Sequence, residues 1–488
     1  MTRAAKLRRT PRSEFVIGLL VFASCAYFHG GAASNQNARL DAIFSFVEPG
    51  TAFTGTFRID RFLPLPERDI NTNDWAHYGG HYYANKAPGS IVLGAAVYTA
   101  VHYTQSLFGT DARNARTAIV DSYLINLALG AACLAVAALL FFRMLRPEVS
   151  ERRAAALTLG LFLGTGLFPY ATQLWGHPTA AAFVVFAMYE LRKATPRGAA
   201  WGGFWLAASV ATDYLALLAA VGLALGYLVH SPRHVLRVAV GTLGPVLALL
   251  AYHWLCFGSP WTLATTYSNP AYLRPERALG MFAGPQYSVW LELLLGTYRG
   301  VLAQMPVMLL CCVGFVHWWR RSPRDPWLWS CLLTSLAASL TVAGFNGWHG
   351  GSTVCARYLL PFVPIAFFAA KELPSTRTGS ALALLLGGLS VCNMLAVAAV
   401  SPLCPDKDRN PLYGYTYDLF FQGKLAPYDL SIRLLRYGPH WSAVRGFTTW
   451  NLGELLGLTG LWTLLPLLVL WLAAAVVLVR AEPAEVAS

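Results

Sequence analysis

Charged side chains gather in a few polar stretches of this chain, and the stretch at residues 34–117 is the richest of them. The sequence YYANKAPGS within it places Lys86 just before Pro88 and Gly89. Proline in the first turn marks a helix start, where free N–H groups attract anions. A lysine beside those N–H groups predicts a phosphate-binding site at the membrane surface.

Carboxylates in the same stretch are candidates for a general base, the group that removes a proton from an acceptor. For each of them, a solvated surface charge is the alternative explanation. Asp60 and Asp74 are the leading candidates and Asp41 is the third. Asp74 precedes Lys86 in a loop that can fold back over the same site.

Arg357 is the second candidate for phosphate binding. It follows the glycine-rich sequence NGWHGGS and precedes an apolar segment. A guanidinium group there suits bidentate phosphate recognition, although a long side chain reaching the membrane interface explains it equally well. Helix capping or a buried hydrogen bond likewise competes with function at several other ionisable positions. These further site candidates are His81, His177, Asp213 and His349.

The histidines of the first polar stretch do not predict a metal centre. His77 and His81 have the i, i+4 spacing of one helix face, but Gly79 and Gly80 between them break a helix. No third ligand follows at a fixed spacing. We expect neither a metal nor a cofactor.

Composition assigns the bulk of the chain to a membrane. Of its 488 residues, 56% are hydrophobic and 12% are charged, about half the charged fraction of a soluble domain. The mean hydropathy is +0.47. The net charge of +13 would suit nucleic-acid binding in a soluble protein. Most of the positive charge lies in short loops on one side of the membrane, so membrane topology explains the net charge. We therefore expect no nucleic-acid partner.

Apolar segments separated by short basic loops predict an all-α integral membrane protein. The basic loops all fall on the cytoplasmic side, with the N-terminus, only if residues 90–108 lie along the outer interface without crossing. About twelve spans then remain, and a large first outer loop contains juxtamembrane helices. We expect residues 1–400 to form the polytopic domain and residues 401–488 to add an outer loop and the last span. The apolar segments are residues 15–33, 90–108, 118–142, 154–170, 177–191, 199–212, 214–230, 235–256, 300–319, 327–345, 359–370, 378–400 and 456–479.

The order of several motifs resembles the protein O-mannosyltransferase and lipid A aminoarabinose transferase families, in their bacterial branch. The matching elements are GHYYANKAPG, TQLWGHPTAAAF, YRGVLAQMP and WHGGSTVCARYLLP, over about the first 370 residues. The resemblance implies a polytopic, C-type glycosyltransferase that uses a polyprenyl phosphate-linked sugar. It also matches Lys86 to the lysine that contacts the phosphate in those families, with Ala87 in place of a proline.

One departure from the family pattern concerns the catalytic base. These families carry an Asp-Glu pair just after the first span, and the corresponding residues here are Asn35 and Gln36. An amide cannot accept the proton. The base of the family therefore does not carry over, and another carboxylate must supply it if the protein is active.

The sequence thus predicts transfer of a hexosyl or pentosyl group from undecaprenyl phosphate to a lipid, glycan or protein acceptor. The site would face the periplasm from the inner membrane. A membrane transporter or flippase is one alternative, which usually shows internal repeats and helices broken at mid-membrane. A catalytically degenerate relative is the other, because of Asn35 and Gln36.

Overall fold

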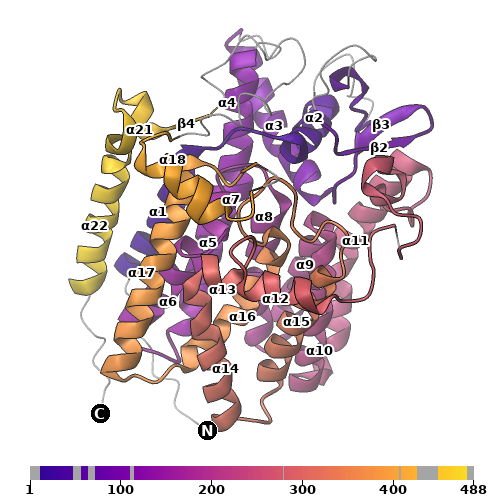
Figure 1. The fold of residues 1–488 in the computed structure, drawn as a ribbon. Helices are drawn as coiled ribbons and strands as arrows, with labels where there is room; N and C mark the ends of the chain where they lie inside the picture. Colours follow the sequence, from indigo (N-terminus) through magenta and orange to yellow (C-terminus); the bar gives the residue numbers. More distant parts are fainter. Residues whose placement is uncertain are drawn as a thin grey trace.

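The computed structural model describes residues 11–47, 56–63, 72–109, 115–278, 280–405, 408–425 and 449–480. The protein is mostly helical, and the long helices run side by side through the height of the molecule (Figure 1). Short strands and short helices occupy one end (Figure 1). The all-α architecture expected from the sequence is confirmed in this respect.

Each apolar segment expected from the sequence is helical, because a run of apolar residues satisfies its backbone polar groups internally only as a helix. In chain order the helices are α1 (Pro11–Ala26), α3 (Gly89–Leu107), α4 and α5 (Ala115–Asn126, Cys133–Leu145), α6 and α7 (Glu151–Leu163, Leu167–Tyr170), α8 (Gly176–Arg192), α9 (Pro196–Thr212), α10 (Leu217–His230), α11 (Val235–Phe257), α13 and α14 (Val301–Gln304, Leu309–Arg321), α15 (Pro326–Ala343), α16 (Val363–Phe367), α17 (Arg377–Val400) and α22 (Leu465–Arg480).

Five helical stretches of the described residues are long and apolar enough to cross a membrane. The total of about twelve spans remains a prediction, because helices such as α8 and α9 have 17 residues each, at the lower limit of about 17 for a span. The place of α3 at the interface likewise remains a prediction. The five stretches are Ile119–Leu145, Pro232–Phe257, Pro326–Ala343, Arg377–Val400 and Gly460–Arg480.

The short basic loops meet at one end of the bundle, where α10 and α14 also end (Figure 1). Arg143 lies 2.6 Å from Glu14, at the start of α1. Arg192 and Lys371 both pair with Glu148, so three separate loops share one carboxylate. These ion pairs place the loops on one side, as the distribution of positive charge predicts.

The opposite end carries the polar segments. A β-hairpin of β2 (Trp75–Tyr78) and β3 (His81–Ala84) lies beside α2 (Ser34–Val47) and α3 (Figure 1). The list of apolar segments does not include α2, because its apolar stripe of Leu40, Ile43, Phe44 and Val47 belongs to a helix of 14 residues, too short to span a membrane. It is nevertheless buried on almost every side.

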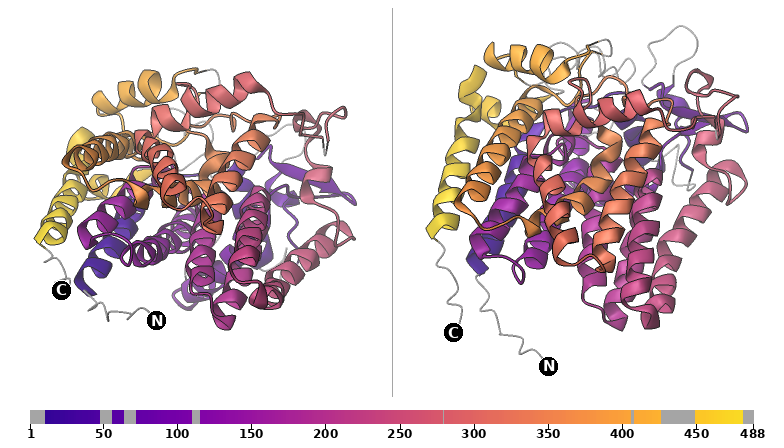
Figure 2. Two further views of the ribbon diagram at one scale, coloured as in Figure 1. Left: turned by 90° about the horizontal axis from the view of Figure 1, so that it is seen from below. Right: turned by 60° about the horizontal axis from the view of Figure 1, so that its bottom comes forward.

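The last part of the chain joins the first. Strand β1 (Phe28–His29) pairs antiparallel with β4 (Trp450–Asn451). Helix α22 packs against α1 on one flank of the bundle (Figure 2). The outer ends of the first and last helices are therefore tied together.

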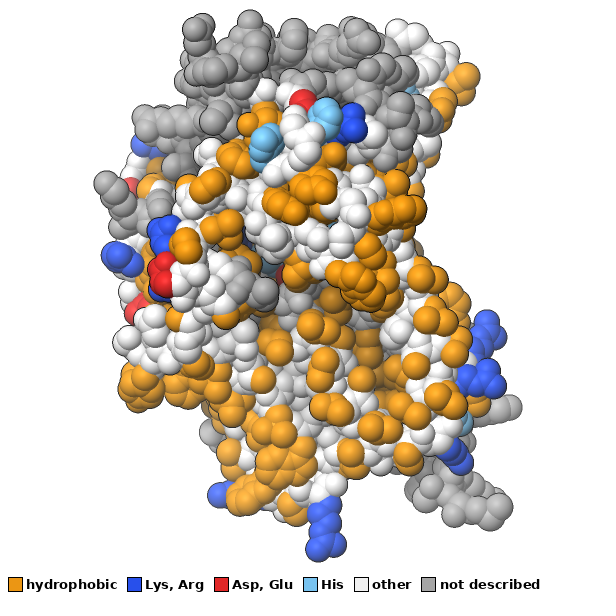
Figure 3. All heavy atoms as spheres, turned by 90° about the vertical axis from the view of Figure 1, so that its right-hand side faces the viewer, with side chains coloured by type: hydrophobic (Ala, Val, Ile, Leu, Met, Phe, Trp, Pro, Cys, Tyr) orange, Lys and Arg blue, Asp and Glu red, His pale blue; other side chains and the backbone are white. Residues whose placement is uncertain are grey.

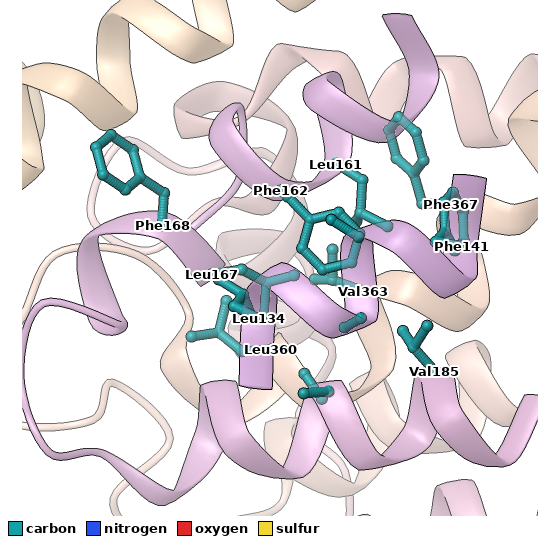
Figure 4. Packing of buried hydrophobic residues seen from close by; sticks show 14 of the residues in the cluster. Leu134, Phe141, Leu161, Phe162, Leu167, Phe168, Val185, Leu360, Val363 and Phe367 are labelled. Carbon is teal, nitrogen blue, oxygen red and sulfur yellow. The ribbon is translucent and has the colours of Figure 1, made fainter. Parts of the chain in front are cut away.

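Aromatic and branched aliphatic side chains fill the centre of the bundle. Phe141, Phe162 and Phe367 meet there with Leu134 and Val363 (Figure 4). The outward faces are also apolar: Figure 3 shows hydrophobic side chains across the flank of the molecule, with Lys and Arg towards its lower edge. In the stretch Pro232–Phe257, which contains α11, only 17% of the most apolar part is buried inside the protein, as expected of a helix that faces lipid.

Candidate active site

Several elements meet at the polar end of the bundle, and two glycines allow their close approach. A Cβ at Gly89, the start of α3, would lie 2.5 Å from Thr212 Oγ1 at the end of α9. A Cβ at Gly176, the start of α8, would lie 2.7 Å from the Thr212 carbonyl oxygen and 3.1 Å from Arg39 Nη2. The starts of α3 and α8, the end of α9 and one face of α2 therefore converge on one place.

Lys86 reaches this place from the base of the hairpin. The backbone N–H of Asn85 donates to the backbone oxygen of Asp74 at 3.3 Å, which brings the two ends of the hairpin together. The Lys86 ammonium then lies 2.7 Å from Asp74 Oδ1, and both side chains are largely buried. The sequence predicts that Asp74 and Lys86 lie near the same site, and in the structure the two side chains form a direct ion pair.

Arg39, which the sequence analysis does not select, is a second buried cation of the site. Its Nε donates to Ser90 Oγ at 3.1 Å, in the first turn of α3. Its Nη1 donates to the backbone oxygen of Asn35 at 3.0 Å and also to the side-chain oxygen of Asn35. The guanidinium group is thus fixed by neutral partners.

Arg357, at the start of the 3-10 turn Arg357–Phe362, is the third cation. Its guanidinium lies over the rings of Trp175 and Tyr358, 4.6 and 4.9 Å from their centroids. It donates to the Tyr358 hydroxyl at 3.1 Å, while its buried Nε has no hydrogen-bond partner among the described residues. A buried donor without a partner is costly, and an incoming anion would satisfy it.

His177 and Asp213 form a buried pair next to Arg357. His177 Nδ1 lies 2.5 Å from Asp213 Oδ2. The other carboxylate oxygen of Asp213 accepts the Leu215 backbone N–H at 3.1 Å. The imidazole is stacked on Trp175 and meets the edge of Tyr358, at centroid distances of 5.9 and 5.5 Å. The pair therefore shares its aromatic wall with Arg357.

The balance of charge at the site is positive. Among the described residues, neither Arg39 nor Arg357 forms an ion pair with a carboxylate. Burial lowers the pKa of Lys86 below the ordinary value of lysine; Asp74 opposes this shift, and Arg39 and Arg357 add to it. Burial also lowers the pKa of Arg39, to about 10. Three cations that repel one another at close quarters are stabilised when an anion binds between them.

The other predicted site residues lie outside this cluster. Asp60 accepts the Tyr82 backbone N–H at 3.0 Å and lies 3.3 Å from His81 Nδ1, so it is bound to the side of the hairpin. Asp41 is fully buried within α2. His349 contributes its carbonyl oxygen to a hydrogen bond of 2.6 Å with Arg299 Nε. Thus Asp74 is the one expected base that the structure brings to Lys86.

Arg299 orders the glycine-rich loop that precedes Arg357. Its side chain is fully buried and donates to the carbonyl oxygens of His349 and Gly351, the latter at 2.8 Å. Gly350 has φ +75, and a Cβ there would lie 3.0 Å from Arg357 Nε. The glycine is therefore required both by its backbone conformation and by the approach of the arginine.

The amides that replace the acidic pair of the family have structural partners. Asn35 accepts from Arg39, as described above. Gln36 Oε1 accepts the Ala33 N–H at 3.0 Å, at the start of α2, and its Nε2 donates to Gln173 Oε1 at 3.2 Å. Gln173 Oε1 also accepts from Trp175 Nε1 at 2.9 Å. Gln36 thereby supports the indole on which Arg357 lies.

Comparison with known proteins gives a match in fold. No protein-family model and no curated protein sequence matches the chain. Among solved structures, ArnT from Cupriavidus metallidurans bound to undecaprenyl phosphate superposes with a TM-score of 0.53 at 12% sequence identity. The match covers 97% of this chain and 77% of ArnT. The chain has the fold of ArnT.

ArnT is a lipid A aminoarabinose transferase of the C-type glycosyltransferase fold, so the family resemblance inferred from sequence motifs is confirmed at the level of fold. The apo state of the same ArnT gives a TM-score of 0.47 at 13% identity, covering 96% of this chain and 76% of that one. Together with the apolar helices, the ArnT-like fold identifies a multi-pass membrane protein.

Proposed function

We propose that this protein transfers a sugar from a polyprenyl phosphate-linked donor to an acceptor at the outer face of the inner membrane. The observation that carries the proposal is the convergence of Arg39, Lys86 and Arg357, with Asp74 as the one ion-paired carboxylate among their described contacts. The ArnT fold adds support, because ArnT was solved with undecaprenyl phosphate bound.

The chemistry requires a stabilised leaving group. When the acceptor attacks the anomeric carbon, the bond to the phosphate oxygen breaks and negative charge develops on the lipid phosphate. Fixed cations in a site that excludes water stabilise such charge far more than water does. Lys86 exchanges Asp74 for the phosphate, and Arg357 places its unsatisfied Nε on a phosphate oxygen.

The proposed orientation follows from the two ends of the molecule. The cluster lies at the end that carries α2 and the hairpin, opposite to the end where the basic loops meet (Figure 1). Positive loops remain in the cytoplasm. The N-terminus is therefore cytoplasmic and the site faces the periplasm.

Turnover of defined donors tests the function. Purified protein is incubated with undecaprenyl phosphate linked to glucose, mannose, galactose, arabinose or aminoarabinose, with a cell-envelope extract as the source of acceptors. We expect release of undecaprenyl phosphate from at least one donor. Lys86→Ala and Arg357→Ala each lose a charge-assisted bond worth about 1.5–3 kcal/mol, or about tenfold or more in rate.

Lys193→Ala is the matched control, because Lys193 is a cation at the opposite end of the bundle whose contacts, an ion pair with Glu190 and the ring of Tyr189, lie within its own helix end. Normal turnover by Lys86→Ala and Arg357→Ala would place the site elsewhere. Movement of intact donor between leaflets without release of undecaprenyl phosphate would indicate a flippase. Binding of undecaprenyl phosphate without turnover of any donor would indicate a degenerate relative.

A further inference from the structure

The site as described lacks an obvious proton acceptor. Asn35 and Gln36 are amides, and Asp60 is bound to the hairpin. Asp74 lies in the cluster, but its Oδ1 is 2.7 Å from the Lys86 ammonium. That oxygen is therefore occupied by the ammonium group. Asp74 is therefore suited to orienting Lys86 more than to removing a proton.

The His177–Asp213 pair has the arrangement of a general base. Asp213 is fixed at both oxygens, by His177 Nδ1 at 2.5 Å and by the Leu215 N–H at 3.1 Å. A carboxylate on Nδ1 holds the proton of a neutral imidazole there, which leaves Nε2 as the acceptor. Nε2 makes no hydrogen bond with any residue that the structure describes. An imidazole held in this tautomer is ready to take a proton.

The pair also stands beside the groups that hold the phosphate. Trp175 stacks on the imidazole on one side and lies under the Arg357 guanidinium. Arg39 Nη2 lies 3.1 Å from the Cβ position of Gly176, the residue before His177. A sugar attached to a phosphate between Arg39 and Arg357 would therefore have its anomeric carbon close to the imidazole.

We propose that His177 is the general base of the transfer, that Asp213 is its positioning residue, and that the acceptor reacts through a hydroxyl group. This proposal rests on the transferase function proposed above. The acceptor oxygen forms a bond with the anomeric carbon while the bond from that carbon to the phosphate oxygen breaks. The hydroxyl proton passes to His177 Nε2, and the bonding electrons leave with undecaprenyl phosphate.

A hydroxyl acceptor follows from the need for a base. An ionised phosphate or carboxylate acceptor has no proton to lose, and a cluster of cations alone would serve it. A neutral hydroxyl is a poor nucleophile until its proton is removed, and a positioned base typically contributes about 10²–10⁴-fold. A purely structural pair, which joins α8 to α9, is the alternative explanation of the same contact.

Azide separates the two explanations, because it is an anion that attacks without losing a proton. Wild type, His177→Gln and Asp213→Asn are supplied with the donor that the wild type turns over, and with either glycerol or azide as acceptor. Asp213→Asn replaces an acceptor by a donor at Nδ1 and so favours the wrong tautomer. His230→Gln and Asp418→Asn, at exposed positions outside the cluster, are the matched controls. Each variant is first checked for thermal stability and for binding of undecaprenyl phosphate.

We expect both dyad variants to lose about 10²–10⁴-fold in transfer to glycerol and to keep formation of the glycosyl azide. Should His177→Gln fail to fold, Asp213→Asn, which keeps the size of the side chain, provides the same comparison. Equal loss of both reactions with undecaprenyl phosphate binding retained would overturn the proposal in favour of a structural pair. Unchanged transfer to glycerol would also overturn it.

Asp74→Asn provides the remaining comparison. If this variant loses transfer to glycerol and keeps azide transfer while the dyad variants resemble wild type, Asp74 is the base and the proposal is wrong. Failure of the transferase function itself gives a different result, in which the wild type releases no undecaprenyl phosphate from any donor.

Discussion

Arg39 donates to both oxygens of Asn35, the backbone oxygen and the side-chain oxygen, within one turn of α2. The amide therefore fixes the guanidinium without neutralising it. A carboxylate at residue 35 would instead form a buried ion pair with Arg39. Asn35, which stands where the sequence resemblance implies an acid, leaves the positive charge of Arg39 available to a phosphate.

Asn35→Asp is accordingly expected to weaken binding of undecaprenyl phosphate by about tenfold, the loss of one charge-assisted contact. Titration of the purified variant with undecaprenyl phosphate measures the effect. Gln286→Glu is the control, because Gln286 is exposed and directly precedes α12 (Tyr287–Leu295), where a carboxylate at the helix start is tolerated. A gain of turnover in Asn35→Asp from an inactive wild type would instead support the degenerate relative.

Asp74→Asn is expected to change binding more than chemistry. Removal of the carboxylate frees Lys86 from its ion pair of 2.7 Å and raises the positive charge of the site. Undecaprenyl phosphate should bind more tightly and leave more slowly, so multiple-turnover rates fall while the single-turnover rate stays within about tenfold of wild type. Rapid-quench measurement of one turnover checks this. A single-turnover loss of about 10²–10⁴-fold would identify Asp74 as the base.

Binding of undecaprenyl phosphate should weaken as the pH rises through the pKa of Lys86. Burial lowers this pKa, so the cation is lost at lower pH than for an exposed lysine. The phosphate itself, with its second pKa at about 6, carries constant charge in the alkaline range.

Lys86→Arg provides the comparison for this pH dependence, because arginine remains charged throughout the range. The variant should bind with less pH dependence over this range. Affinity measured at a series of pH values, at constant ionic strength, gives the two curves. Identical curves for wild type and variant would exclude Lys86 as the titrating group.

Helix α3 is expected to lie on the outer side without crossing. Single cysteines replace Leu107, whose side chain is 85% exposed at the end of α3, and Arg152 in the first turn of α6. The exposed native thiols Cys312 and Cys392 are first changed to alanine. An impermeant maleimide applied to intact cells should label position 107 and not position 152. Labelling at position 152 from outside would reverse the proposed topology.

The sequence by itself determined the helices and the side of the basic loops. Apolar length and loop charge are local properties, so α5, α11 and α17 could be placed from composition alone. Lys86 and Arg357 were selected for the same reason, since each stands next to a local helix-start or glycine-rich pattern. Helix α2 is not among the expected apolar segments because it is too short to span a membrane, and its polar face is buried by neighbours that the local sequence does not reveal.

Only the tertiary structure decided which of these groups meet. His177 and Asp213 are 36 residues apart, and their contact depends on how α8 and α9 pack. Asp60 and Asp74 looked equivalent in the sequence, yet the pairing of β2 with β3 binds one to the hairpin and delivers the other to Lys86. Arg39 lies in the cluster because Gly89 and Gly176 let the starts of α3 and α8 approach the end of α9. Such encounters depend on side-chain packing between distant segments, and local residue patterns carry no information about them.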